Sequence, residues 1–413
     1  MSQQVSARNV SLVSCGDYDA QKVYGAIRQS IDLIGGIEAF IKPGTRVLLK
    51  PNLVRSMAPE RAATTHPSLV AAVARLVREA GATPVIAESP GGPYTAATLK
   101  STYRRTGIEA AAQLSGAELN YDTGASQVSN PGGRVLHRLD LIDPLLQADA
   151  VINLPKLKTH NLTTLTMGVK NLFGLVPGAL KIGYHSKLIE RELFCEGLLD
   201  LMLYVRPALT IMDAIVAMEG EGPTGGSPRP VGAIIAAADP LDVDTLGAAL
   251  VGIDPLQILT TRLAAARGLT TGKVEDLVIL GDSLDDLSVS GFLQGIESPL
   301  DPGLLPAPLR PLVRLATPST INDKPDTRGA RALRSLAQGW IWKQLVARPR
   351  ATDRCIACGF CVKHCPVNAI SLINGRARMD SHTCIRCYCC HELCPHDAIE
   401  LVKSPLGRLA SPR

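Results

Sequence analysis

Short apolar runs alternate with segments of helical periodicity over about the first 295 residues of the chain. Apolar runs of about four to eight residues, bounded by glycine, proline or polar positions, are typical of buried strands. We expect such strands at 46–50, 83–88, 148–154, 209–213, 231–236 and 277–280. Apolar residues spaced by three and four positions predict helices at 67–80, 186–205, 242–250 and 255–267. Strands that alternate with crossover helices indicate an α/β domain with a mostly parallel sheet covered by helices.

The pattern changes near residue 300, where six prolines fall between 302 and 325. Such a cluster of prolines indicates a linker. A helical pattern then follows at 328–347, with arginines and a lysine beside leucines and a tryptophan. This basic helix could be a docking element for a membrane surface or a partner. The interpretation we favour is a helix that packs the C-terminal module onto the α/β domain. The predicted domains are an α/β domain at 1–297, a linker with the basic helix at 298–350, and a third domain at 351–405.

Eight of the 11 cysteines lie in two copies of one spacing near the C-terminus. The copies are Cys355, Cys358, Cys361 and Cys365 before Pro366, and Cys384, Cys387, Cys390 and Cys394 before Pro395. This is the C-x2-C-x2-C-x3-C-P run of bacterial ferredoxins, in which thiolates hold [4Fe–4S] clusters. A zinc site needs two well-separated ligand pairs instead. We therefore predict an α+β ferredoxin domain with two [4Fe–4S] clusters.

The fourth cysteine of each run binds the other cluster in two-cluster ferredoxins. The predicted ligand sets are Cys355, Cys358, Cys361 and Cys394 for the first cluster, and Cys384, Cys387, Cys390 and Cys365 for the second. Cys389 lies out of register with the run, and we interpret it as a small apolar filler or free thiol rather than a residue that tunes cluster potential. Both runs continue into similar segments, 367–370 and 396–399, which indicates an internal pseudo-twofold repeat.

Composition and charge limit the cellular compartments and the classes of partner that we expect. The chain has 413 residues, is 46% hydrophobic and carries a net charge of +5, which suggests two or three domains and does not indicate nucleic acid. No apolar run reaches the roughly 18 residues of a membrane span. The polar residues 1–9 argue against a lipoprotein signal before Cys15. Clustered cysteines without a secretory signal predict a cytoplasmic protein, in which Cys15 and Cys195 are plain buried thiols.

Polar residues gather where the predicted strands end, and open α/β sheets bind ligands at the carboxyl ends of their strands. The candidate segments are 50–53 with 65–67, 88–92, 153–185, and 213–226. The third is the richest, because it brings lysines and histidines together among leucines. Such a segment favours an anion, such as a carboxylate or phosphate substrate. The chain contains neither G-x-G-x-x-G nor G-x-x-x-x-G-K-[ST], so we do not expect a nucleotide site of either kind.

Several of these segments occur in a characteristic order. The motifs are Lys-Pro-Asn-Leu (50–53), Thr-His-Pro (65–67), Asn-Leu-Pro-Lys-Leu-Lys-Thr-His (153–160), Lys-Asn-Leu-Phe-Gly (170–174), Met-Asp-Ala-Ile (212–215) and Met-Glu-Gly-Glu-Gly-Pro (218–223). Together they resemble the DUF362 family, whose name stands for a domain of unknown function. Many members resemble this chain further in carrying a C-terminal two-cluster ferredoxin domain. The resemblance therefore implies the architecture and leaves the reaction open.

Three functions are compatible with these features. The one we favour is an iron–sulfur oxidoreductase that passes low-potential electrons to a small anionic substrate. The second is a non-catalytic electron-transfer or adaptor protein for a partner redox enzyme. The third is a non-redox enzyme that acts on a carboxylate and carries structural clusters.

The favoured function assigns roles to particular residues. The predicted proton carriers or catalytic groups are His160, His185, Asp213 and Glu219. The predicted substrate-binding residues are Lys50, Asn52, His66, Lys156, Lys158, Lys170 and Asn171. We also expect a redox partner protein.

Overall fold

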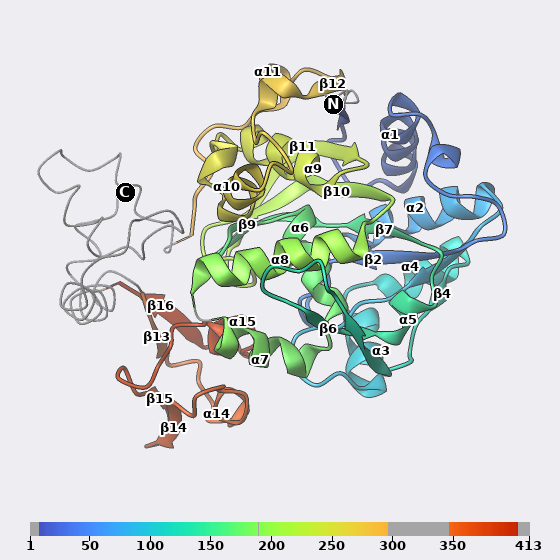
Figure 1. The fold of residues 1–413 in the computed structure, drawn as a ribbon. Coiled ribbons are helices and arrows are strands. Elements are labelled where there is room, and N and C mark those ends of the chain that lie inside the picture. The colour runs from blue at the N-terminus through green and yellow to red at the C-terminus, as the bar shows by residue number, and fades with distance from the viewer. Residues whose placement is uncertain (1–7, 189, 296–346, 404–413) are drawn as a thin grey trace, which may run out of the picture. The chain divides into compact units, whose positions relative to one another are not determined.

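The computed structural model describes residues 8–188, 190–295 and 347–403, and the chain divides into two compact units, Met1–Gly295 and Ile296–Arg413 (Figure 1). The predicted linker and basic helix lie almost wholly outside the described residues. None of the described helices is long and apolar enough to cross a membrane.

Ten of the described strands form a single sheet in the first unit. Its order is β12-β1-β11-β10-β7-β2-β3-β4, and β8 pairs with β10 and β9. In chain order these strands are β1 (Asn9–Ser14), β2 (Arg46–Pro51), β3 (Thr83–Ile86), β4 (Glu118–Leu119), β7 (Ala150–Leu154), β8 (Lys156–His160), β9 (Thr164–Thr166), β10 (Leu209–Glu219), β11 (Ser227–Ala237) and β12 (Val278–Gly281). Most neighbouring pairs are parallel, and β11 runs antiparallel to both of its neighbours. The predicted mostly parallel sheet is confirmed.

Helices cover both faces of this sheet (Figure 1). The larger ones are α1 (Ala20–Leu33), α2 (Pro67–Glu79), α3 (Ala96–Arg105), α4 (Ile108–Ser115), α7 (Gly178–Lys187), α8 (Arg191–Val205), α9 (Pro240–Leu250) and α10 (Leu259–Ala266). Strand β2 shows the two-sided burial directly, because alternate side chains of a strand point to opposite faces. Val47 and Leu49 pack into the core beneath α1 and α2, whereas Leu48 packs with residues of α8.

Shorter elements complete the first unit. They are the hairpin β5 (Ala125–Ser129) and β6 (Arg138–Ile142), the helices α5 (Asp143–Leu146), α6 (Gly168–Asn171) and α11 (Leu284–Leu287), and the 3-10 turns η1 (Ile37–Ala39), η2 (Pro59–Arg61), η3 (Leu172–Leu175), η4 (Pro255–Gln257) and η5 (Val274–Asp276).

Helix α2 begins and ends at the signals that its sequence carries. Pro67 occupies the first turn, where the missing N–H costs nothing, and the ring of His66 accepts the N–H of Ser68 at 3.2 Å. At the other end Gly81 adopts a φ of +77°, which glycine tolerates better than other residues. The helix therefore holds His66 at the carboxyl edge of the sheet.

The structure corrects three of the predicted elements. Residues 156–160, which lie beyond the predicted strand 148–154, form the fully buried strand β8, which pairs with β10. Strand β10 continues beyond the predicted 209–213 to Glu219, because β11 pairs along its whole length. The predicted helix 186–205 is two helices, α7 and α8.

The described part of the second unit consists of two short β pairs and two short helices. They are β13 (Arg348–Ala351), α14 (Phe360–Lys363), β14 (Ile370–Ile373), β15 (Arg376–Met379), α15 (Cys389–Glu392) and β16 (Ile399–Val402). Strand β13 pairs antiparallel with β16, and β14 with β15. This arrangement confirms the predicted α+β class of the C-terminal module.

Candidate functional site

Three lysines are buried where β2 ends and along β8. The side chains of Lys50, Lys156 and Lys158 are each only 1% exposed. An ammonium group removed from water costs several kcal/mol unless oxygen atoms around it replace the lost hydration. The partners of these lysines therefore define what the site is made of.

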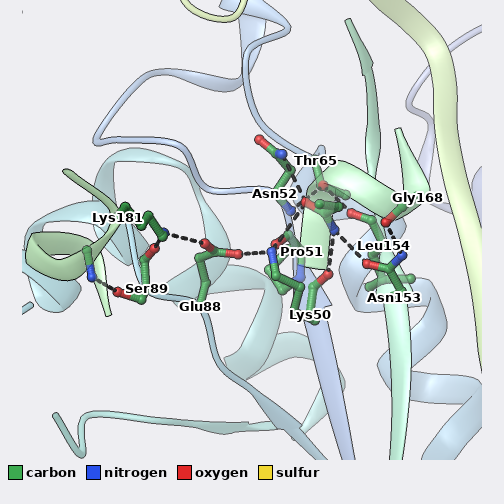
Figure 2. A network of polar contacts seen from close by, with 12 residues as sticks. Lys50, Pro51, Asn52, Thr65, Glu88, Ser89, Asn153, Leu154, Gly168 and Lys181 are labelled. Carbon is green, nitrogen blue, oxygen red and sulfur yellow. Dashed lines mark hydrogen bonds and ion pairs between the residues drawn. The ribbon is translucent and has the colours of Figure 1, made fainter. Parts of the chain in front are cut away.

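A continuous polar network joins Lys50 and Lys158 to Lys181 of α7. Figure 2 shows Lys50, Asn52, Glu88 and Lys181 of this network. We call it the lysine–asparagine network; its members are Lys50, Asn52, Glu88, Lys158, Asn171 and Lys181. Lys50 forms an ion pair with Glu88 and lies 3.3 Å from the side-chain oxygen of Asn171. That oxygen also accepts the Asn52 amide at 2.9 Å. Asn52 in turn accepts Lys158 Nζ at 2.9 Å.

Two asparagines connect the network to the ends of the strands by hydrogen bonds. The Asn171 amide donates to the Lys50 carbonyl at 3.2 Å and to the Asn153 side chain at 2.8 Å. The Asn153 amide donates to the carbonyl of Gly168 at 2.9 Å. Short helix α6 is thereby fixed against β2 and β7, so the amide of Asn171 stays in place beside Lys50.

Glu88 follows strand β3 and lies between two lysines (Figure 2). Its second oxygen lies 3.9 Å from Lys181 Nζ, and Lys181 donates to the carbonyl of Ser89. Gly174 packs directly on the pair, because a Cβ there would overlap both Glu88 and Lys50. The pKa of Lys181 is lowered to about 7, chiefly by burial. Glu88 opposes this shift, and Lys50 adds to it.

A second group of polar residues surrounds Asp213 of β10, and we call it the Asp213 cluster (Tyr18, His66, Lys156 and Asp213). Lys156 Nζ lies 2.9 Å from one carboxylate oxygen, which also accepts the backbone N–H of His66 at 2.9 Å. The Tyr18 hydroxyl donates to the other oxygen at 2.8 Å and accepts Lys156 Nζ at 2.7 Å. The His66 and Tyr18 rings stack at 3.6 Å. Burial lowers the pKa of His66 to about 4, so this imidazole is neutral at pH 7.

The remaining predicted residues have partners of their own. His160 is 4% exposed and accepts the N–H of Leu162 at 3.0 Å. Glu219 accepts the N–H of Leu293 at 3.0 Å; it lies six residues beyond Asp213 along β10, or roughly 20 Å at the rise of a strand. Lys170 lies 4.7 Å from the centre of the Phe173 ring. His185 belongs to α7, and its side chain lies outside the described residues.

The predicted site residues did not include Tyr18, Lys181 or Asp244, and Glu88 appeared only within the candidate segment 88–92. Asp244 accepts the N–H groups of Gly168 and Val169, at 2.5 and 3.2 Å, and so holds the start of α6. Burial raises its pKa to about 7. An acidic residue directly after a strand is a usable signal for Glu88. No local motif singles out Lys181 within the candidate segment 153–185.

Cysteines of both runs lie close to one another in the second unit. One cavity is lined by the side chains of Cys355, Cys358, Cys361 and Cys394 together. Burial raises the pKa of Cys390, and the nearby thiols of Cys387, Cys384, Cys361 and Cys365 raise it further. Backbone N–H groups point at the fourth sulfur of each run, from Ala369 to Cys365 at 3.2 Å and from Ala398 to Cys394 at 3.3 Å. Such donors stabilise thiolates that bind metal, so these residues fit iron–sulfur ligation.

The comparisons with known proteins agree with this division. Residues 47–249 match the family described as Domain of unknown function (DUF362), and residues 351–371 match the 4Fe-4S binding domain. The chain is 34% identical over 298 residues to a thylakoid-associated protein from Synechocystis sp., which covers 72% of this chain and 91% of that protein. The chain belongs to the DUF362 family and carries a 4Fe–4S binding domain, so it is an iron–sulfur protein.

Two solved structures show a weaker likeness. One is a lactate racemase apoprotein from Thermoanaerobacterium thermosaccharolyticum, with 11% identity, a TM-score of 0.36, and coverage of 56% of this chain and 54% of that one. The other is a Thermotoga maritima protein, with 10% identity, a TM-score of 0.33, and coverage of 53% and 55%. The chain therefore spans about half the length of each of these structures.

The buried Lys156–Asp213 pair gives a stability prediction. Lys156→Met leaves the Asp213 carboxylate without its cation, and we expect a loss of about 3 kcal/mol in the free energy of unfolding. Adding Asp213→Asn removes the unpaired charge. The double variant should therefore lose less free energy of unfolding than the two single losses added together, by at least about 1 kcal/mol. Urea unfolding of the four proteins measures this coupling.

The matched control is Lys22→Met, which removes a lysine from an exposed ion pair with Asp17 at 2.7 Å. Exposed pairs contribute little, so no measurable change is expected there. Strictly additive effects of the Lys156 and Asp213 substitutions would contradict the direct pairing.

Proposed function

We propose that this protein is an iron–sulfur oxidoreductase in which two [4Fe–4S] clusters serve a small anionic substrate at the lysine–asparagine network. When bound, the clusters supply single electrons at low potential. The observation that carries the proposal is the pairing, within one chain, of a cluster-binding cysteine module with an α/β domain that concentrates lysines at the ends of its strands.

A repeated backbone geometry supports a second cluster beside the one that the matched family model covers. Ala357 and Gly359 in the first run have φ values of +55° and +74°, and Arg386 and Tyr388, each 29 residues further on, have +58° and +58°. Non-glycine residues rarely adopt this left-handed conformation. Its recurrence at equivalent positions supports one wrapping of the chain around two equivalent clusters.

The same repeat extends beyond the cysteines. Helix α14 contains the third cysteine of the first run as α15 contains that of the second, and strands β14 and β16 come after the fourth cysteines. Asn368 and Asp397, each three residues after the fourth cysteine of its run, have φ values of +53° and +47°. Each backbone N–H donor to a fourth sulfur also has its counterpart. These likenesses support equal ligation by both runs.

The charge of the lysine–asparagine network supports an anionic substrate. Lys50 and Lys181 both lie beside the single carboxylate of Glu88. Two ammonium groups beside one carboxylate leave positive charge that a carboxylate or phosphate can neutralise. Lys158 and the amides of Asn52 and Asn171 extend this buried set of donors.

The Asp213 cluster supplies the proton chemistry in this proposal. Asp213 holds Lys156 and Tyr18 within hydrogen-bonding distance of one another, and burial first, then Asp213, raises the pKa of the Tyr18 hydroxyl. Tyr18 therefore keeps its proton at neutral pH. If Tyr18 gives this proton to a substrate, Lys156 can supply another to the Tyr18 oxygen. His160 and His185 remain candidate proton carriers, and Glu219 has a separate anchoring contact with Leu293.

An electron carrier that serves a partner protein is the second candidate. Three apolar side chains of the second unit are well exposed, Ile356 by 65%, Leu372 by 46% and Ile373 by 49%. Ile356 and Leu372 line the same cavity as the predicted ligands of the first cluster, Cys355, Cys358, Cys361 and Cys394. Exposed apolar groups beside a redox centre suit a transient protein contact. The thylakoid association of the Synechocystis relative supports a partner at a membrane surface rather than the predicted location free in the cytoplasm.

Iron content after paired substitutions tests the two clusters and their crossed ligands. Anaerobically reconstituted protein should hold about eight iron and eight sulfide ions. Cys358→Ser with Cys394→Ser removes two ligands of one cluster, so about four iron ions should remain. Cys358→Ser with Cys365→Ser damages both clusters and should remove most of the iron.

The matched control is Cys389→Ala, which should keep the full iron content because Cys389 lies outside both ligand sets. The two double variants carry the same number of substitutions and differ only in which fourth cysteine is lost. Opposite results for the two pairs would show that each run binds its own cluster. Stoichiometric zinc in place of iron would contradict the iron–sulfur assignment.

Binding of simple anions tests the network. Pyruvate and inorganic phosphate should raise the melting temperature of the wild-type protein at low ionic strength, because ligands that bind only the folded state stabilise it. This shift should shrink as sodium chloride rises, since salt screens the attraction. Lys158→Met should lose most of the shift, while Lys42→Met, at an exposed position, should keep it. Equal shifts in both variants would place the anion elsewhere.

A further inference from the structure

Lys181 differs from the other lysines of its network in how its charge is compensated. Lys50 takes one oxygen of Glu88 as its ion-pair partner. Lys181 Nζ lies 3.9 Å from the other oxygen, which is longer than a hydrogen bond. One carboxylate neutralises one ammonium, so the second ammonium group is poorly compensated in this buried setting.

The physical consequence is an amine that loses its proton easily. The pKa of Lys181 is lowered to about 7, chiefly by burial; Glu88 opposes this shift, and Lys50 and Lys170 add to it. The unfolded chain keeps this proton up to about pH 10.4. Lys181 therefore lowers the free energy of unfolding at and below pH 7, and this cost disappears as the pH rises towards 10.

Lys181 is also the most exposed lysine of the network. Its side chain is 14% exposed, against 1% for Lys50 and Lys158. The Ser89 carbonyl accepts one of its N–H bonds, and the Ser89 hydroxyl accepts the N–H of Gly178 at 2.7 Å at the start of α7. The helix and its amine are thus fixed to the segment that carries Glu88.

We propose that Lys181 is a nucleophilic amine that captures the carbonyl group of a small oxo acid as an imine. Such lysine imines require a neutral amine beside a proton-transfer group, and Glu88 is placed for that transfer. Nζ attacks the carbonyl carbon and forms the C–N bond. The two amine protons leave with the carbonyl oxygen as one water molecule, so no oxidant or reductant is consumed.

The oxo acid follows from the charge of the site. Once the imine nitrogen takes up a proton, it carries a positive charge beside Glu88, which already pairs with Lys50. A carboxylate on the captured molecule neutralises that charge, which a neutral aldehyde or ketone does not. The inference rests on the proposed function only for the anionic character of the substrate. Capture at Lys181 requires no electrons from the clusters, so its test is independent of electron transfer.

Reductive trapping tests the inference directly. Cluster-loaded full-length protein is incubated anaerobically with pyruvate or glyoxylate and sodium cyanoborohydride, and the modified lysines are identified by peptide mass spectrometry. We expect at least about tenfold more adduct at Lys181 than at Lys187, an exposed lysine of the same helix, because an ordinary lysine is almost fully protonated at pH 7.5. The labelling of Lys181 should rise with a midpoint near pH 7.

Two variants control the assignment. Lys187→Met should leave the adduct at Lys181 unchanged, and Lys181→Arg, which keeps a cation, should remove it while retaining the iron content and the thermal transition. The distribution of adducts in the wild-type protein decides the question even if Lys181→Arg folds poorly. Adducts spread evenly over exposed lysines, or an unlabelled Lys181, would overturn the proposal. Acylation of Lys181 by acetic anhydride at neutral pH without trapping of either oxo acid would also overturn it, since the amine would be neutral but not carbonyl-binding.

Discussion

The burial of lysine ammonium groups at the ends of the sheet strands is the constraint on which the first unit depends. Lys50, Lys156 and Lys158 are almost completely removed from water, and each buried charge costs several kcal/mol unless oxygen atoms surround it. Glu88 and Asp213 supply carboxylates, and Asn52 and Asn171 supply amides. Because these partners come from different strands, loops and helices, the same contacts hold the strand ends together and concentrate charge where open α/β sheets bind ligands.

The second unit depends on a different kind of bond. Its buried apolar cluster is small and includes Cys394 beside Ile370, Ala377, Ala398 and Ile399. A core of this size contributes little stability by itself, so metal ligation and folding are coupled in such a module. The repeated left-handed positions give both cysteine runs the same local conformation. The protein therefore combines an α/β domain that has a large apolar core with a cysteine-rich module that has a small one.

Local patterns predicted the sheet, helix α2 and the cysteine module, because each is marked by periodicity, capping residues or spacing. The buried strand β8 was not predicted, since Lys156 and Lys158 read as a polar loop until their distant partners are known. Lys156 meets a tyrosine 138 positions away, and Lys158 an asparagine 106 positions away. Glu219 was grouped with Asp213 because the length of β10 was underestimated. Lys181 lies in the candidate segment 153–185 but was not singled out there, because its properties come from burial and from its charged neighbours.

The most direct test of the whole account is the reoxidation of the reduced protein in a stopped-flow instrument. Dithionite-reduced protein, freed of excess reductant, is mixed anaerobically with the small-molecule fraction of cells that produce it, and the visible absorbance of the clusters is followed. If electrons leave the clusters for a substrate at the lysine–asparagine network, reoxidation should be saturable. Lys158→Met should abolish it, whereas Lys42→Met, with the same iron content, should retain it. Equal reoxidation rates in these two variants would show that electrons leave the clusters without using the lysine–asparagine network, which contradicts the proposed oxidoreductase.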